Sequence, residues 1–296
     1  MSTNPSPTIV TERVDDIPLL LHHLEQMGVP QLLDAHFPTH GNWDGLSLGW
    51  TTTIWLVYIL SQADHRLSQV QDWAAQHLET LKTCTGMPIC DSNFADDRLS
   101  AILRHLNKDT PWEAYEQNQG KHLIRVYDLS SFRVRLDTTT ASTYQAPTLN
   151  GLFQKGHSKD HRPDLAQVKI MLASLDPLGL PLATEVVDGS RADDPLYEPI
   201  IEKVRATLNR SGVLYVGDTK MAATQTVANV ANNKDCYLVP LPATIVPQEV
   251  LDTYLEPVMD GSQLLTDVYR ELPNGSSQKI AEGYELTETR TVEINE

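Results

Sequence analysis

One change of pattern constrains the fold of this chain more than any other feature of the sequence. Up to about residue 120, apolar residues recur every three or four positions, as in 67–78, which is typical of amphipathic helices. In 132–137 (FRVRLD) apolar and charged residues alternate one by one. A period of two is the period of a β-strand with one buried face. The sequence therefore predicts a helical N-terminal part followed by a part that contains a sheet.

The segments after residue 130 predict an α/β layer arrangement with a mixed sheet. A strand at 132–137 is followed by a hairpin over 167–187, and further elements alternate between helix (195–208, 221–232) and strand (212–217, 236–239). From about 245 we expect only short β-like segments and turns. The expected organisation is a disordered tail (1–14), a helical N-terminal domain (15–120), an α/β core (121–245) and a β-rich segment (246–296).

Charge is distributed unevenly along the 296 residues. The whole chain carries a net charge of −16, which argues against a protein that coats nucleic acid or an anionic membrane with its entire surface. Residues 121–180 nevertheless contain eight lysines and arginines and only five aspartates and glutamates. We expect this basic segment to bind anions locally, although chance variation on a solvated surface would produce the same pattern.

The remaining composition excludes several classes of protein. Three cysteines are too few for a disulfide framework or a complete zinc site, and they indicate reduced thiols in a cytoplasmic protein. The most apolar stretch, 46–60, is shorter than the roughly 20 residues of a membrane-spanning helix. We therefore expect a buried core helix there and no membrane association.

Two aspartates at strand ends are the strongest candidates for chemistry. Asp137 and Asp218 each stand where an apolar strand stops, and ligands of open α/β sheets bind at such ends. If the two strands are neighbours, the two carboxylates converge and must share a proton or hold a cation. Mg²⁺ accepts such ligands and completes its shell with water and phosphate. The alternative is that each aspartate only caps a turn.

A basic run at 155–164 (KGHSKDHRPD) supplies candidate phosphate contacts. Cationic side chains bind phosphate oxygens, and the candidates are Lys155, Lys159, His161 and Arg162, together with Lys220 beside Asp218. The spacing of His157 and His161 matches no strong zinc signature. The alternative interpretation is a polar, solvated connection.

These motifs resemble those of DDE transposases of bacterial insertion sequences, and most of all the IS four superfamily. The resemblance spans about residues 15–240 and is carried by four runs: Leu-Asp137-Thr-Thr-Thr, Gly156-His-Ser-Lys-Asp-His-Arg-Pro-Asp164, Asp188-Gly-Ser-Arg-Ala-Asp193 and Gly217-Asp218-Thr-Lys. It implies an RNase H-like catalytic core after the helical domain. It also implies that the segment after 245 is the start of a β-rich insertion.

The resemblance further implies a mechanism and partners. Asp137 would be the first metal-binding catalytic carboxylate and Asp218 the second, with Mg²⁺ (or Mn²⁺) as cofactor. Water and then a DNA 3′-hydroxyl would attack a phosphodiester of transposon-end double-stranded DNA. A homodimer in the DNA complex and a cytoplasmic, nucleoid-associated location would follow.

One family motif is missing from this sequence. The third carboxylate of the family lies in a Tyr–Arg–Glu–Lys signature, but none of the four tyrosines after Asp218 is followed three residues later by arginine. We therefore expect an incomplete core, in a truncated transposase that is inactive alone. Two alternatives stay open: a non-catalytic DNA-binding or dimerising regulator, and a nuclease that takes Asp193 or Glu185 as its third ligand. Asp193 would otherwise cap the helix that begins near Pro195.

Overall fold

The computed structural model describes residues 11–159, 161–289 and 291 of the chain. It divides into two compact units. One unit contains the chain up to residue 131 with 177–184 and 202–209, and the other contains 132–176, 185–201 and the chain from 210. Residues 1–10 of the expected tail lie outside the described residues. Glu12, further along the same segment, accepts hydrogen bonds from the backbone N–H groups of Glu79 and Thr80 (3.0 and 2.8 Å).

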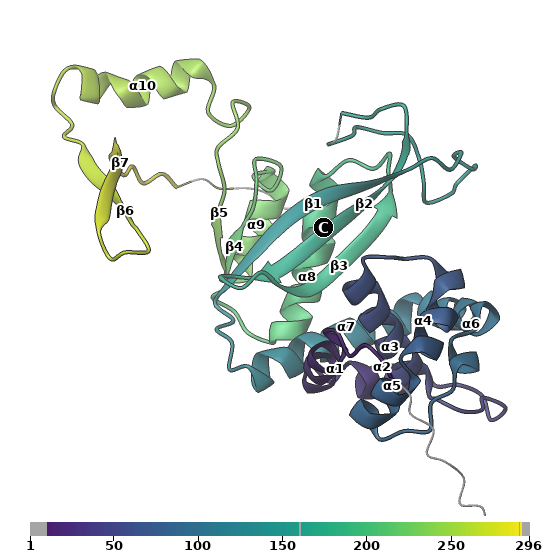
Figure 1. The fold of residues 1–296 in the computed structure, drawn as a ribbon. Coiled ribbons are helices and arrows are strands. Elements are labelled where there is room, and N and C mark those ends of the chain that lie inside the picture. The colour runs from purple at the N-terminus through teal and green to yellow at the C-terminus, as the bar shows by residue number, and fades with distance from the viewer. Residues whose placement is uncertain (1–10, 160, 290, 292–296) are drawn as a thin grey trace, which may run out of the picture. The chain divides into compact units, whose positions relative to one another are not determined.

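The first unit is helical, as the apolar periodicity predicts (Figure 1). Its central helix is α3, which is buried along most of its length. Side chains from six helices, α1 to α6, are buried and form its core, among them Ile17, Ile54, Leu81, Leu99 and Ile102. The helices are α1 (Ile17–Gln26), α2 (Val29–His36), α3 (Leu48–Gln62), α4 (Val70–Gln76), α5 (Leu78–Thr85), α6 (Asp96–Leu106) and α7 (Asp109–Val126), with 3-10 turns at Leu67–Gln69 and Asp91–Phe94.

Helix α3 buries three consecutive threonines without leaving their hydroxyl groups unpaired. Thr51, Thr52 and Thr53 each donate a hydrogen bond of 2.8 Å to the carbonyl four residues earlier. A buried hydroxyl without a partner would cost stability, so these bonds allow a polar run inside the core. Among the described residues no helix is both long enough and apolar enough to cross a membrane.

Helices α2 and α3 approach each other closely at Gly49. The carboxylate of Asp34 on α2 accepts hydrogen bonds from the Ser47 hydroxyl (2.7 Å) and from the Gly49 N–H (2.6 Å). It thereby satisfies one of the free N–H groups at the start of α3. A Cβ atom on Gly49 would lie 2.0 Å from the carbonyl oxygen of Pro30, so only glycine fits this crossing.

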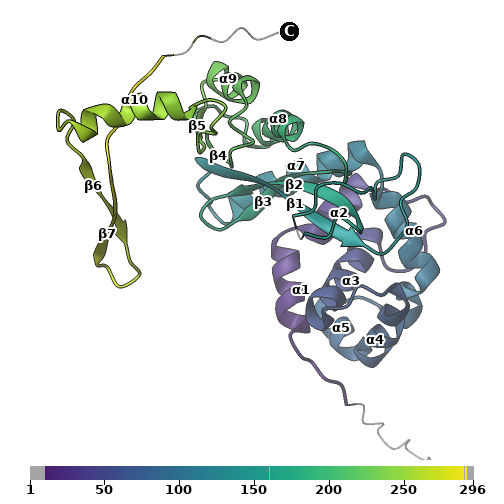
Figure 2. The same ribbon diagram turned by 90° about the horizontal axis from the view of Figure 1, so that it is seen from above.

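The five-stranded sheet has the order β3-β2-β1-β4-β5 (Figure 1), and most of its residues belong to the second unit, whereas 180–184 of β3 belong to the first. Strand β1 pairs antiparallel with β2 and parallel with β4, and β4 pairs parallel with β5. Helices α8 and α9 lie on the same side of this sheet, as Figure 2 shows from above. The elements are β1 (Arg133–Thr143), β2 (Ala166–Leu175), β3 (Leu180–Asp188), the 3-10 turn Asp194–Leu196, α8 (Tyr197–Leu208), β4 (Leu214–Val216), α9 (Thr224–Asn232) and β5 (Cys236–Leu238).

The predicted fold class is confirmed. A helical N-terminal region precedes a mixed five-stranded sheet with helices, consistent with an RNase H-like core. Alternation along β1 also follows the sequence: Val134, Leu136 and Thr138 are buried, whereas Arg133, Arg135 and Asp137 are exposed. The charged residues of β1 therefore share one face of the sheet.

The segment after residue 245 differs from the sequence-based expectation. It forms helix α10 (Gln248–Met259) before a two-stranded antiparallel sheet of β6 (Thr266–Glu271) and β7 (Ser277–Gly283). The prediction of β-like segments alone was wrong for 248–259. Val250, Leu251, Tyr254 and Leu255 recur at helical spacing there, but no residue of α10 is buried. A turn at 273–275 joins β6 and β7, in line with the turns expected in this segment.

The α2–α3 crossing yields a stability test. Gly49→Ala forces a methyl group against the Pro30 carbonyl, and we expect a loss of about 3 kcal/mol in the free energy of unfolding. Gly41→Ala is the matched control, because a Cβ at Gly41 meets nothing within 4 Å. Urea unfolding followed by circular dichroism measures both variants. Equal stabilities of the two variants would refute this account of the crossing.

Candidate active site

The parallel pairing of β1 with β4 brings the two predicted aspartates to the same level of the sheet. The last residue pair of this ladder is Arg135 with Val216. Asp137 and Asp218 each follow that pair by two positions. Neighbouring strands lie about 4.8 Å apart. The condition for convergence, that the two strands be neighbours, is therefore met.

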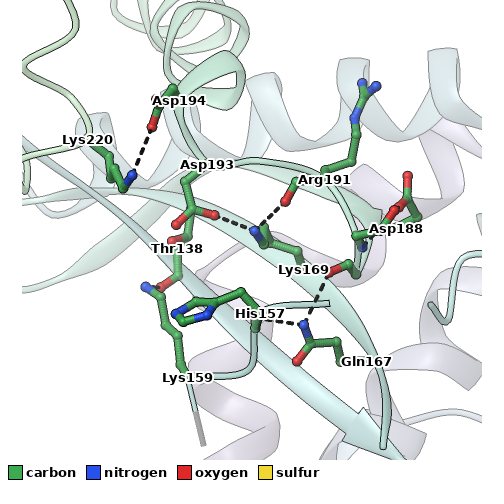
Figure 3. A network of polar contacts seen from close by, with 12 residues as sticks. Thr138, His157, Lys159, Gln167, Lys169, Asp188, Arg191, Asp193, Asp194 and Lys220 are labelled. Carbon is green, nitrogen blue, oxygen red and sulfur yellow. Dashed lines mark hydrogen bonds and ion pairs between the residues drawn. The ribbon is translucent and has the colours of Figure 1, made fainter. Parts of the chain in front are cut away.

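Asp137 lies on the solvent-facing side of β1, with 78% of its side chain exposed. Its Oδ1 accepts a hydrogen bond from the Thr138 N–H (2.7 Å) and lies 3.4 Å from the Nζ of Lys159. The same ammonium group donates to the carbonyl oxygen of Thr138, as the close-up shows (Figure 3). A cationic group therefore already lies beside the first aspartate.

Two hydrogen bonds orient the Asp218 carboxylate, and both are accepted by its Oδ1. The hydroxyl of Tyr197 donates a hydrogen bond of 2.7 Å to this oxygen, and the backbone N–H of Lys220 donates another of 2.9 Å. Tyr197 is fully buried at the start of α8. Asp218 itself is exposed to solvent.

The surroundings of Tyr197 raise the pKa of its hydroxyl group. Burial raises the pKa of Tyr197, and the hydrogen bond and charge of Asp218 and the charges of Asp137 and Asp193 raise it further. Tyr197 therefore stays a neutral hydrogen-bond donor at physiological pH.

The basic run at 155–164 is anchored to the sheet through Gln167 of β2 (Figure 3). Gln167 is fully buried, and its side-chain N–H groups donate to the carbonyls of His157 (2.8 Å) and Gly189 (3.2 Å). Its backbone exchanges two hydrogen bonds with Gln154 (3.0 and 2.9 Å). A Cβ on Gly156 would lie 2.0 Å from the Gly189 carbonyl oxygen, so the loop backbone packs directly on the end of β3.

A buried ion pair lies close to this anchor. Nζ of Lys169 on β2 contacts Oδ1 of Asp193 at 2.5 Å and donates to the carbonyl oxygen of Arg191 at 2.5 Å (Figure 3). The side chain of Lys169 is 6% exposed and that of Asp193 19%. The expectation that Asp193 caps the following helix was wrong, because its side chain makes no capping hydrogen bond. The buried lysine attracts the carboxylate instead. The lysine within the apolar run 168–172 (VKIML) is the sequence feature that indicates a buried ion pair here.

The other predicted phosphate contacts are spread over the loop and its surroundings. Lys155 and His161 are exposed. Arg162 makes two hydrogen bonds to the carboxylate of Asp164 (2.8 and 2.7 Å). Nζ of Lys220 lies 3.8 Å from Oδ1 of Asp194. Lys159 is the residue of this set that contacts Asp137; the role of the others in DNA binding stays a prediction.

Asp137 and Asp218 each lie two positions after the last residue pair between β1 and β4, and no third acidic ligand accompanies them in the part of the chain that the structure describes. Within these residues no group of three or more histidine, cysteine, aspartate or glutamate side chains could hold a metal ion. Glu185 lies on β3, which β2 separates from β1. Asp193 is neutralised by Lys169. If both carboxylates bound the same ion, Mg²⁺ or Mn²⁺ would have two carboxylate ligands, a number that such ions accept when water and phosphate complete the shell.

No family model and no curated protein matches this sequence. Among solved structures, the piggyBac transposase synaptic complex with hairpin DNA is similar with a TM-score of 0.37 and 12% identity over 79% of this chain. This chain spans about half (53%) of the piggyBac chain.

Two structures of the Mos1 transposase are also similar. The paired-end complex with the left transposon end has a TM-score of 0.26 and 10% identity, covering 85% of both chains. The strand transfer complex has a TM-score of 0.27 and 12% identity over 86% of this chain and 84% of that one. The fold assignment itself rests on the order and direction of the strands in the sheet.

The buried ion pair yields a second stability test. Lys169→Met leaves the Asp193 carboxylate without its buried partner, and we expect a loss of about 3 kcal/mol in the free energy of unfolding at neutral pH. The control is the double variant Lys169→Met/Asp193→Leu, which removes both charges and should recover most of that loss. Chemical denaturation of the full chain measures both. A double variant as unstable as the single one would mean that the pairing does not cause the effect.

Proposed function

We propose that this chain is a DDE-type transposase of the insertion-sequence kind, which cuts and joins transposon-end double-stranded DNA. Asp137 and Asp218 would hold Mg²⁺ or Mn²⁺. One observation supports the proposal: Asp137 on β1 and Asp218, just beyond the parallel neighbour β4, each lie two positions after the last residue pair of these strands. Such a pair is costly unless a cation or a proton neutralises it.

The chemistry of the donors fits a hard divalent metal. Carboxylate oxygens are the ligands that Mg²⁺ and Mn²⁺ prefer. The Lys159 ammonium group lies beside the Asp137 carboxylate, where a metal ion would bind. When bound, such metal ions activate an attacking oxygen and stabilise the leaving oxygen of a phosphodiester. The hydroxyl of Tyr197 would orient the Asp218 carboxylate through its hydrogen bond. Cations of the basic run, such as Lys155, would bind the phosphate backbone.

A second function is favoured by a specific observation. The described residues bring no third acidic ligand to Asp137 and Asp218, as a complete DDE site would require. A non-catalytic DNA-binding or dimerising regulator derived from a transposase needs no such ligand. Incubation of a plasmid with the full chain and Mn²⁺ separates the two. Nicking that Asp137→Asn abolishes supports the enzyme, whereas DNA binding without nicking supports the regulator.

Metal binding can be tested without any activity. We expect Asp137→Asn and Asp218→Asn each to weaken Mn²⁺ binding by about tenfold or more, because each removes one of two anionic ligands. Isothermal titration calorimetry of the full chain with MnCl₂ measures the affinity. Asp188→Asn is the matched control, because the Asp188 carboxylate bonds to Ser190 rather than to this site. Wild-type affinity in both site variants would rule out this metal site.

The salt dependence of DNA binding tests the basic run. For each phosphate that the protein no longer neutralises, the slope of log K against log salt should decrease in magnitude by about 0.9. We expect this change in Lys155→Gln, measured by fluorescence anisotropy of a labelled duplex with the full chain. Lys234→Gln, an exposed lysine in the turn after α9, is the control that should leave the slope unchanged. Equal slopes in wild type and Lys155→Gln would remove Lys155 from the interface.

A further inference from the structure

We propose that Lys159 is a resident cation of the candidate active site, which occupies the position beside Asp137 until a divalent metal displaces it. This inference rests on the proposed function, since it requires Asp137 to bind metal. It assigns to Lys159 a role in metal loading that differs from the phosphate contact predicted from the sequence.

The first step of the argument is that the loop backbone delivers Lys159 to a defined place. Buried Gln167 holds the His157 carbonyl, and Gly156 packs against Gly189. Ser158 is buried, and its hydroxyl accepts a hydrogen bond from the Arg162 N–H (3.2 Å). The residues just before Lys159 are therefore fixed to the sheet, which limits where its side chain can reach.

The second step concerns what the ammonium group contacts. It lies 3.4 Å from Oδ1 of Asp137 and donates to the carbonyl oxygen of Thr138. A carboxylate next to a backbone carbonyl is a pair of oxygen ligands that hard divalent cations also take. The ammonium therefore satisfies the same oxygens that a metal ion would use.

The third step is that the two cations exclude each other. An ammonium group and a divalent ion on one carboxylate repel strongly at a separation of a few ångströms. The Lys159 side chain is 37% exposed and can swing into solvent when a metal arrives. Metal binding would then release a positive charge from the anchored basic loop, where it can meet a phosphate. Metal loading and DNA binding would be coupled through this lysine.

Manganese titration of three variants tests the displacement. Lys159→Gln removes the competing charge, and we expect Mn²⁺ to bind about fivefold more tightly, the upper end of what an exposed ion pair contributes. Lys159→Arg keeps the charge and should stay near wild-type affinity. Lys234→Gln, a charge removal in the exposed turn after α9, is the control and should change the affinity less. Unchanged or weaker binding in Lys159→Gln would overturn the inference.

A second measurement uses the wild-type chain and so avoids any effect of substitution on folding. Lysine acetylation by an activated ester, followed by mass spectrometry, reports how free each ammonium group is. We expect acetylation of Lys159 to accelerate relative to Lys155 when Mn²⁺ is added. An equal or slower rate at Lys159 with Mn²⁺ would contradict displacement.

The two proposals fail in different ways. If Asp137→Asn leaves Mn²⁺ affinity unchanged, the metal site of the proposed function is wrong. If Asp137→Asn weakens Mn²⁺ binding but Lys159→Gln does not tighten it, the metal site stands and only the role of Lys159 is wrong.

Discussion

The parallel pairing of β1 with β4 is the constraint on which the candidate site depends. Parallel neighbours cannot be joined by a tight turn, so β2, β3 and α8 lie between them in the sequence. Val134 and Tyr215, which face each other across this pair, are fully buried. Apolar burial therefore holds the two strands together and offsets the repulsion between the carboxylates just beyond them. The core supplies the stability, and the charged carboxylates lie on the exposed face of β1 and just after β4.

Positive and neutral donors reach these charges from separate elements. Lys159 comes from the loop before β2, Tyr197 from the start of α8 and the Lys220 N–H from the turn after β4. Each approaches through a short, locally fixed segment. The Lys169–Asp193 pair ties the residues before α8 to β2, close to where that helix presents Tyr197. These donors offset the negative charge of the two aspartates locally, whereas the chain as a whole is strongly acidic.

Sequence reasoning reached the features that local pattern encodes. The alternation of 132–137 predicted β1 and its exposed face. The prediction that the strand stops at Asp137 was wrong, because β1 continues through its paired threonines to Thr143, whereas Asp218 does lie just after the end of β4. Sequence reasoning did not reach contacts that depend on the path of a loop, such as Lys159 on Asp137, or on a helix start, such as Tyr197 on Asp218. Sequence reasoning also missed helix α10. Its apolar residues have helical spacing, but turn-forming residues flank the segment and no residue of the helix is buried.

The contact between Gly156 and Gly189 limits which substitutions the basic loop tolerates. Both positions exclude any side chain, because each would place a methyl group on the backbone of its surroundings. A variant at either site would lift the basic loop from the sheet even with every lysine and arginine intact. The attachment of the loop therefore depends on two residues that carry no charge, and the roles proposed for Lys155 and Lys159 depend on that attachment.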